Sequence, residues 1–447
     1  MTTSLTRSLR IVASVAIGVA AMTSVACHDF LKVEDPGRFS NEALDNVTVL
    51  TAVANGVEGQ FQQVYDDFVV FTGLNSDELI NSSTWIEWAD VSTGKLRGDW
   101  PTATPGWSTA MDEILRNRYA AQNAADRLTR VLGADAANKS PLMAQVKVYE
   151  AWADLVLGMG YCEAPLSQNA ARSPDTELYK QAITKFTTAI GIAQAASTPQ
   201  WVNFGLAGRA RANLFAGKYD EALADAQAVP DGFIKQALYS TNSATSFVGN
   251  QLHYNRNRSG GLHPLYWSMV DTSNSNSGVT NPVQYVKDPW TNQPDLRMAV
   301  SHKAGGVAIG VDNTTKHYAI QKYADYTNPI TLTSKREMNL IEAEVQWRKG
   351  QFPTAIADMN RNRTTAPANL PAFDATGLTS QQVLDRLLSE RFAELFVEGH
   401  RMTDLDRFGL VAAKLGTGRA RKFPLSRNEI LNNTNMKPGV AACPAIS

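Results

Sequence analysis

The sequence predicts an all-α protein, an α/α superhelix in which pairs of helices stack on one another. Apolar residues recur at three- and four-residue spacing along several long stretches of the chain, which places them on one face of a helix. A pattern of two helices joined by a glycine turn also occurs twice. Two segments, at about 74–106 and 231–330, are instead rich in aromatic and turn-forming residues. We predict them to be long irregular loop insertions in the helical frame.

The first 26 residues have the features of an export signal. Arg7 and Arg10 precede an apolar run from Ile11 to Met22 that is too short to span a bilayer. Ser24-Val25-Ala26 then precedes Cys27, which looks like a lipoprotein cleavage box, although Ser24 stands where leucine is usual. A non-lipoprotein peptidase could also accept that site. We therefore predict residues 1–26 to be a lipoprotein signal peptide, Cys27 to be the lipid anchor, and residues 27–447 to form a single domain.

Helices are predicted in order along the chain from the spacing of their apolar residues. Two of them also carry capping boxes at their start, Ser334 with Glu337 and Thr379 with Gln382. The predicted helices are 41–65, 107–132, 142–159, the segment after Pro174, 202–216, 334–349 and the stretch that begins at Thr379 and ends near Gly399.

An internal repeat supports the stacking of helix pairs. The segment 217–225, GKYDEALAD, can be aligned with 350–358, GQFPTAIAD. The glycine, the aromatic residue, both alanines, the aliphatic residue and the aspartate match, and a helix is predicted before each segment. This is the tetratricopeptide pattern, in which each helix pair buries its apolar face against a neighbour. Two unrelated alanine-rich hairpins are the alternative.

The helix that begins at Thr379 carries a stripe of like charge. Glu390, Glu394 and Glu398 stand four residues apart, an arrangement that costs a few tenths of a kcal/mol per pair unless cations neutralise it. The nearest cations in the sequence are Arg391, Arg401 and Arg407, with Asp404 between them. We predict a structural ion-pair network of Glu390, Arg391, Glu394, Glu398, Arg401, Asp404 and Arg407.

The same residues are weak candidates for catalysis or metal binding. Glu394 and Glu398 could converge on a metal ion, but His400 lies beyond the break expected at Gly399, and arginines nearby would disfavour a cation. The sequence contains no nucleophile elbow, phosphate loop or zinc pattern. We predict no catalytic residue, no metal and no cofactor. A net charge of −1 gives no electrostatic case for nucleic acid.

The charged stretch resembles the C-terminal signature of the SusD/RagB family of outer-membrane nutrient-binding lipoproteins. The family pattern reads roughly ER-x-x-E-L-x-x-E-G-x-R-x-x-D-L-x-R-x-G. The matching positions here are Glu390-Arg391, Glu394-Leu395, Glu398-Gly399, Arg401, Asp404-Leu405, Arg407 and Gly409. Met402-Thr403 departs from it, because the family commonly has an aromatic pair there. Further similarity follows Cys27 and occurs at 423–430, so the resemblance spans almost the whole mature chain.

The aromatic residues of the two loop segments are the candidates for ligand binding. A flat indole or phenol ring covers the apolar C–H face of a sugar, while amide and charged side chains bind its hydroxyl edge. In relatives, aromatic residues from loops of these two regions form the glycan platform. The candidates are Asn81, Trp85, Trp88, Tyr266, Trp267 and Trp290. For each ring, packing in the core or contact with a partner barrel is the alternative.

The resemblance implies a function that involves no catalysis. We expect a cell-surface lipoprotein, anchored in the outer membrane and facing the exterior, that captures an oligosaccharide or similar polymer fragment. It would lie over a SusC-like TonB-dependent transporter and pass the ligand into it, as part of polysaccharide utilisation. The alternatives are a tetratricopeptide-type scaffold that binds protein partners only, and a helical glycoside hydrolase.

Two further cysteines, Cys162 and Cys443, remain after the anchor. In an oxidising compartment they could form a disulfide that ties the C-terminal tail to the body. Two buried free thiols are the alternative.

Overall fold

A computed structural model of the protein describes residues 43–96, 106–241, 248–256, 259–273, 282–301 and 309–436. The predicted signal peptide, Cys27 and Cys443 therefore lie outside the described residues. The chain divides into two units, residues 1–49 and 50–447. The short 3-10 helix η1 (Val47–Val49) belongs to the first unit, and all elements below belong to the second.

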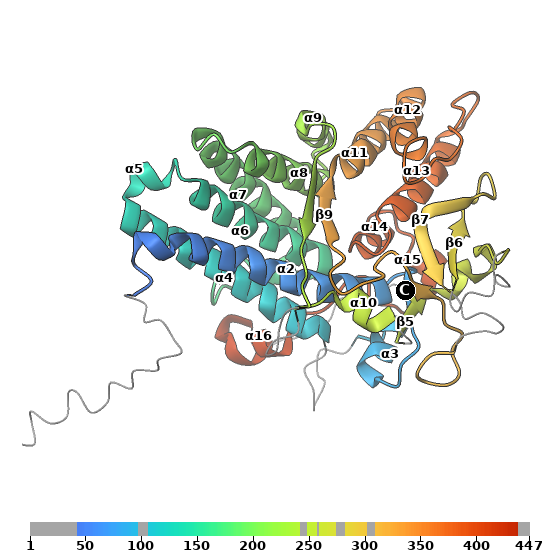
Figure 1. The fold of residues 1–447 in the computed structure, drawn as a ribbon, viewed down its shortest axis with the longest axis horizontal. Coiled ribbons are helices and arrows are strands. Elements are labelled where there is room, and N and C mark those ends of the chain that lie inside the picture. The colour runs from blue at the N-terminus through green and yellow to red at the C-terminus, as the bar shows by residue number, and fades with distance from the viewer. Residues whose placement is uncertain are drawn as a thin grey trace, which may run out of the picture. The chain divides into compact units, whose positions relative to one another are not determined.

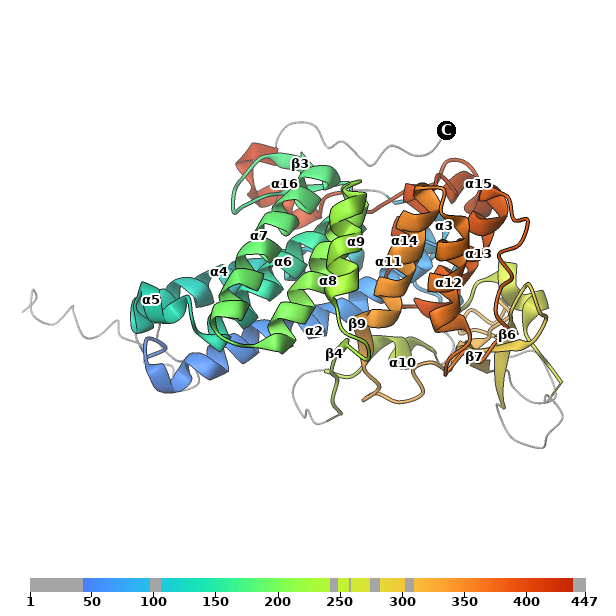
Figure 2. The ribbon, with the colours of Figure 1, turned by 90° about the horizontal axis from the view of Figure 1, so that it is seen from above.

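Helices that follow one another in the sequence stand side by side in the second unit, as Figures 1 and 2 show. Each helix of the row packs against the next. The row consists of α4 (Gly106–Leu132), α6 (Pro141–Gly160), α7 (Asp175–Ala195), α8 (Pro199–Phe215), α9 (Tyr219–Ala228), α11 (Lys335–Arg348), α12 (Phe352–Arg363) and α13 (Ser380–Glu394), with α2 (Leu50–Leu74) packed across α4 and α6. The predicted fold class, a helical frame of tetratricopeptide-like pairs, is confirmed.

Large aromatic side chains fill the core between α6, α7 and α8. The rings of Trp152 and Phe204 stack with their centroids 4.8 Å apart, and Phe186 meets Trp152 edge-on at 5.8 Å. Gly208 allows α8 to approach this closely, because a Cβ atom there would lie 2.3 Å from the Phe186 ring. All three rings are fully buried, so this cluster contributes several kcal/mol of apolar burial to the stack.

The two predicted repeats form equivalent helix pairs, α8–α9 and α11–α12. Both pairs turn at a glycine with a left-handed backbone, Gly217 (φ +75°) and Gly350 (φ +72°). Small residues of the first pair, including Ala222 and Ala226, pack against apolar residues of α11. The predicted start signals are also present, since Ser334 caps α11 and Thr379 forms a complete capping box with Gln382. The repeat alignment therefore corresponds to structural equivalence.

The two aromatic-rich segments contain more regular structure than the sequence suggested. They contribute to a five-stranded antiparallel sheet in the order β1-β5-β8-β7-β6. Its strands are β1 (Leu79–Asn81), β5 (Gly260–Leu262), β8 (Ala319–Ile320), β7 (Pro294–Ser301) and β6 (Val283–Lys287). Leu79 pairs with Leu262, so the sheet joins the two segments directly. The predicted loop insertions are therefore only partly irregular.

Short elements complete the described chain. They are α3 (Ile86–Thr93), α5 (Ala134–Ala137), β2 (Glu163–Pro165), β3 (Arg172–Pro174), β4 (Ile234–Ala237), α10 (Gln251–Arg256), η2 (Pro264–Met269), β9 (Ile330–Ser334), α14 (Arg401–Arg407), α15 (Val411–Leu415), α16 (Arg427–Asn432) and η3 (Thr434–Met436). Among the described residues, no helix is both long and apolar enough to cross a membrane.

Candidate ligand-binding site

The glutamate stripe of α13 begins with Glu390, which lies at the centre of a buried chain of ion pairs. One carboxylate oxygen accepts from Arg297 of β7 and the other from Arg363 of α12, both at 2.7 Å. Arg297 also donates to Asp295 (2.9 and 2.7 Å), and Arg363 donates to Asp288 (2.9 and 2.8 Å). All five side chains are nearly inaccessible to solvent. The chain therefore ties β7 and the turn after β6 to α12 and α13.

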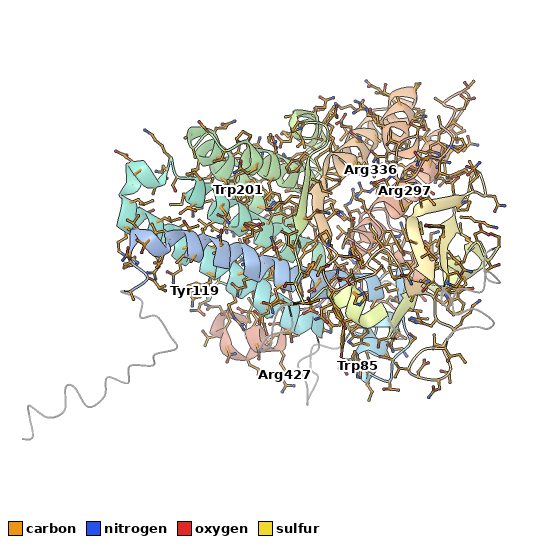
Figure 3. All side chains as sticks on the ribbon, viewed as in Figure 1. Trp85, Tyr119, Trp201, Arg297, Arg336 and Arg427 are labelled. Atoms are coloured by element: carbon orange, nitrogen blue, oxygen red, sulfur yellow. The ribbon has the colours of Figure 1, made fainter. Side chains whose placement is uncertain are left out.

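Glu394 at the end of α13 and Glu398 in the turn that follows also bind cations from elements that are distant in the sequence. Glu394 accepts from Arg297 (3.2 Å) and from two nitrogens of Arg336, which lies on α11 near Arg297 (Figure 3). Glu398 accepts from Lys322 at 2.8 Å. The sequence had suggested arginines of the motif itself as the partners of the stripe, and this assignment was wrong. The cations come instead from elements that are distant in the sequence.

The three arginines of the motif bind carboxylates that are not part of the glutamate stripe, and each arginine donates through two nitrogens. These carboxylates lie on α14, on α11 and just before β1. The pairs are Arg391 with Asp404 (2.8 and 3.0 Å), Arg407 with Glu344 (2.7 and 2.9 Å) and Arg401 with Asp77 (2.5 and 2.7 Å). Burial would raise the pKa of Asp77, but the adjacent Arg401 lowers it below its usual range. These pairs fix the corner between α13 and α14.

A cavity of about 540 Å³ lies beside this network. It is bounded by η2, the strands β6 and β7, and one face of α13. Two of the predicted ligand-binding residues, Tyr266 and Trp290, line it. We call it the α13 pocket. Its lining residues are Tyr266, Met269, Val286, Lys287, Asp288, Pro289, Trp290, Asp295, Met298, Gln381, Leu384, Asp385, Leu388, Ser389, Phe392, Ala393, Arg401, Phe408, Leu410 and Lys414.

Neighbouring side chains hold the two aromatic rings of the pocket in place. The Tyr266 ring stacks on Phe392 with centroids 4.5 Å apart, and its hydroxyl donates to Asp77 at 2.8 Å. The Trp290 indole lies edge-on to Phe373 and beneath the guanidinium of Arg386, 4.5 Å from its centroid. Trp290 remains 41% exposed. A rigid, partly exposed ring beside a cavity is suited to stack on an apolar ligand face.

The other four candidates do not line this pocket. Trp88 is 7% exposed and packs in the core between Phe71 and Trp85. Trp85 is 42% exposed, but it lies at the edge formed by α3, apart from Arg297 (Figure 3). Asn81 uses its side-chain oxygen to accept from the Ser83 backbone and hydroxyl at 3.0 and 2.7 Å. These residues are therefore not part of one platform with Tyr266 and Trp290.

Trp267 also does not line the α13 pocket. Its indole N–H donates to the carbonyl of Leu262 at 2.7 Å, and the ammonium group of Lys316 lies 5.4 Å from its ring centroid. The residue is half-buried. The loop that carries Tyr266 and Trp267 thus directs the two neighbouring rings to different surroundings.

The sequence prediction missed the residues that α13 contributes to the pocket. Leu384, Leu388 and Phe392 line the cavity, and the spacing of apolar residues in this helix places the two leucines on one apolar stripe with Val383 and Leu387. Val383 and Leu387 of the same stripe are buried, while Leu384 and Leu388 are half-buried. The one-residue offset between the two pairs, about 100° around the helix, was the available signal, because it makes the stripe wider than one packing partner requires.

Two titratable groups near the pocket have pKa values that keep them in one protonation state near pH 7. Burial would raise the pKa of Asp288, but its hydrogen bonds with Arg363 and Thr291 lower the value below the usual range. Burial lowers the pKa of His263, which precedes η2, to about 4. His263 is therefore neutral near pH 7. Among the described residues, no group of three or more His, Cys, Asp or Glu side chains could hold a metal ion.

Comparisons with known proteins agree with the fold and the motif. Residues 265–440 match the model of the SusD family. A SusD superfamily protein from Bacteroides vulgatus has 14% identity and a TM-score of 0.65, with 88% of this chain and 98% of that chain covered. A SusD-like protein from Bacteroides fragilis has 12% identity and a TM-score of 0.64, with 90% and 98% covered.

A third similar structure has a more specific description. It is a SusD-like carbohydrate binding protein from Bacteroides vulgatus, with 15% identity, a TM-score of 0.57, and 81% of this chain and 83% of that chain covered. Among proteins with curated descriptions, none matches this chain. The resemblance read from the sequence is confirmed: the chain carries the SusD/RagB pattern, matched over residues 265–440, on the fold of SusD superfamily proteins.

Proposed function

We propose that this protein is a non-enzymatic lipoprotein of the outer cell surface that captures oligosaccharides and passes them to a SusC-like TonB-dependent transporter. The match to the SusD family and the similarity to a SusD-like carbohydrate binding protein support glycan binding. The lipid anchor at Cys27, the transporter and the transfer of ligand rest on the family resemblance alone.

The α13 pocket is the observation on which this proposal chiefly depends. It combines an exposed indole, Trp290, with a second aromatic ring, Tyr266, and places hydrogen-bonding groups such as Gln381 and Ser389 beside them. A sugar ring needs both kinds of contact, because its C–H face is apolar and its edge carries hydroxyl groups. The surrounding ion pairs hold these groups in position before a ligand arrives, which reduces the entropy lost on binding.

Isothermal titration calorimetry with a panel of plant and microbial oligosaccharides tests the proposal. Trp290→Ala should weaken binding by about tenfold or more, because the variant loses the apolar contact area of an indole. Trp85→Ala is the matched control, since Trp85 is equally exposed (42% against 41%) but lies outside the pocket. Circular dichroism would establish that both variants are folded.

Each outcome leads to a distinct conclusion. Loss of binding in Trp290→Ala alone supports the α13 pocket, whereas loss in Trp85→Ala alone moves the glycan site to the α3 edge. If no glycan binds and the protein co-purifies with other proteins, the scaffold alternative replaces the proposal. Sustained release of reducing sugar by the pure protein, abolished by changing one carboxylate, would make it a glycoside hydrolase instead.

A further inference from the structure

The α13 pocket contains both balanced and unbalanced charges. Its charged lining residues are Lys287, Asp288, Asp295, Asp385, Arg401 and Lys414. Three of these are already neutralised by partners within the fold. Asp288 binds Arg363, Asp295 binds Arg297, and Arg401 binds Asp77, in each case through two hydrogen bonds. A ligand gains little from these three groups, because their hydrogen-bonding capacity is largely used.

Two cations of the lining are not neutralised in this way. Within the described ranges, none of the salt bridges involves Lys287 or Lys414. Lys287 is half-buried at the end of β6, and Lys414 is exposed on α15. The one remaining anion, Asp385, is exposed and accepts a hydrogen bond from Gln381 at 2.8 Å. The groups still available to a ligand therefore include two ammonium groups and one carboxylate.

Lys287 also lies close in the sequence to the ring that we expect to stack on the sugar. It is separated from Trp290 only by Asp288 and Pro289, and all four residues line the same cavity. Asp288 is fixed by Arg363 and also accepts from the backbone and hydroxyl of Thr291 at 2.8 and 2.7 Å. This anchoring holds the turn between Lys287 and Trp290 in one conformation. Lys287 and Trp290 therefore bring a cation and an indole to the lining of one cavity.

We propose that the α13 pocket selects acidic oligosaccharides, whose sugar rings carry a carboxylate or sulfate group. The ring would stack on Trp290 and Tyr266, and its anionic group would accept charge-assisted hydrogen bonds from Lys287 and Lys414. Neutral sugars of the same shape would lack these bonds and leave both ammonium groups without a counter-charge. This inference rests on the proposed function, and it adds the chemical class of the ligand.

The test compares ligands that differ in charge but not in the sugar. The first pair is an oligogalacturonate and its methyl ester, in which the same chain has lost its negative charges. Sulfated galactan fragments and their desulfated forms make the second pair, and they separate sulfate from carboxylate as the source of the anion. Neutral xylan, mannan and glucan fragments complete the panel. Affinities are measured by calorimetry with the full mature chain at low and at high NaCl concentration.

The protein variants are Lys287→Gln, Lys414→Gln and the double variant. Lys316→Gln is the control, because Lys316 is half-buried like Lys287 but lies over Trp267, outside the pocket. We expect an acidic ligand to bind at least about tenfold more tightly than its neutral counterpart and to lose most of this advantage in the double variant. Added NaCl should lower the affinity for the acidic ligand and leave the affinity for neutral ligands nearly unchanged.

The failures of the two proposals are distinguishable. Suppose that neutral fragments bind as tightly as acidic ones, that Trp290→Ala weakens the binding of both equally, and that the lysine variants bind both with unchanged affinity. The selection for charge is then refuted, while glycan binding at the pocket stands. An acidic preference that depends on Lys316 instead would move the anion site to the Trp267 face and also refute the inference. If no fragment of the panel binds, the proposed function fails and the inference with it.

Discussion

The backbone of Val397 adopts a conformation that a β-branched residue rarely takes, and a buried carboxyl group supports it. Its φ is +49°, in the left-handed region that favours glycine. The amide of Val397 donates to Glu78 at 2.7 Å, and its carbonyl accepts from the Tyr323 hydroxyl at 3.1 Å. Both contacts are buried. They offset the local strain and set the direction of the chain between α13 and α14.

Glu78 makes the stability of the protein depend on pH. Burial raises the pKa of its carboxyl group to about 8, even though the Val397 amide and Arg401 both act to lower it. The folded state therefore holds a proton that the unfolded state releases near pH 4.5. It follows that the contribution of this group to stability is complete below about pH 4.5 and declines as the pH rises toward 8.

The variant Glu78→Gln should remove this pH dependence, because the amide cannot ionise while its oxygen can still accept from Val397. We expect the free energy of unfolding of the variant to rise relative to wild type by a few kcal/mol between pH 5 and pH 8. Urea denaturation at several pH values measures it. Glu177→Gln, in the exposed pair Lys180–Glu177, is a solvent-accessible control that should show no such trend. A constant difference between Glu78→Gln and wild type across this range would refute the assignment.

The identity of individual pocket-lining residues is the part of the candidate site that the sequence predicts least well. Composition directed attention to the aromatic-rich segments, and two of the candidates, Tyr266 and Trp290, line a cavity. It could not separate Trp85 from Trp88, which are three residues apart yet 42% and 7% exposed. That difference arises because Trp88 packs on Phe71 of α2, a contact that neither the residue type nor the local spacing encodes.

At the scale of secondary structure, one chain of ion pairs joins three elements around the pocket. Glu390 of α13 lies between Arg297 of β7 and Arg363 of α12, and the outer members Asp288 and Asp295 line the cavity. Arginine and carboxylate alternate along the chain, so that each arginine contacts a carboxylate on either side. Such a buried network is costly to break at one member, because each neighbouring arginine loses one of its carboxylate partners without regaining water.

Replacing Glu390 by glutamine should therefore destabilise the protein by about 1–3 kcal/mol, since Arg297 and Arg363 keep their aspartate partners but each exchanges a charge-assisted hydrogen bond for one to a neutral amide. The exposed pair Lys180–Glu177 provides the matched control, and Glu177→Gln should change stability by less than about 1 kcal/mol. Thermal and urea denaturation measure both variants. Near-equal stability of Glu390→Gln and wild type would show that the network contributes little to holding α12, α13 and β7 together.

Helices and their repeats could be predicted from the sequence much better than the sheet. Periodicity locates α4, α6 and α11 to within a residue or two, because a long amphipathic helix repeats its signal over several turns. Strands such as β1 and β8 are only two or three residues long. Their pairing joins Leu79 to Leu262, so the information lies in contacts distant in the sequence. The partners of the glutamate stripe were missed for the same reason.

At the scale of the second unit, the C-terminal segment returns to the middle of the helix stack. Phe423 pairs with Tyr161 at the end of α6, and its carbonyl accepts from the Cys162 amide at 3.1 Å. Further along, the carbonyl of Met436 accepts from Arg172 at 2.9 Å. Met436 is the last described residue and precedes Cys443 by only a few positions. The described chain thus returns to the surroundings of Cys162, and the Cys162–Cys443 disulfide stays a prediction.

The predicted lipid anchor separates attachment of the protein from recognition of its ligand. Acyl chains on Cys27 would each contribute about 0.8 kcal/mol per buried CH₂ group, so more than one chain is needed for stable residence in a membrane. Cys27→Ser, expressed from the full chain in a Gram-negative host, should therefore move from the membrane fraction to the soluble fraction. Cys162→Ser is the matched control and should stay with the membrane, because it removes a cysteine without removing the anchor.

The released Cys27→Ser protein should bind oligosaccharides as tightly as wild type, since every residue of the α13 pocket is still present. Membrane association that persists in Cys27→Ser would mean that another part of the chain, or a partner in the membrane, holds the protein there.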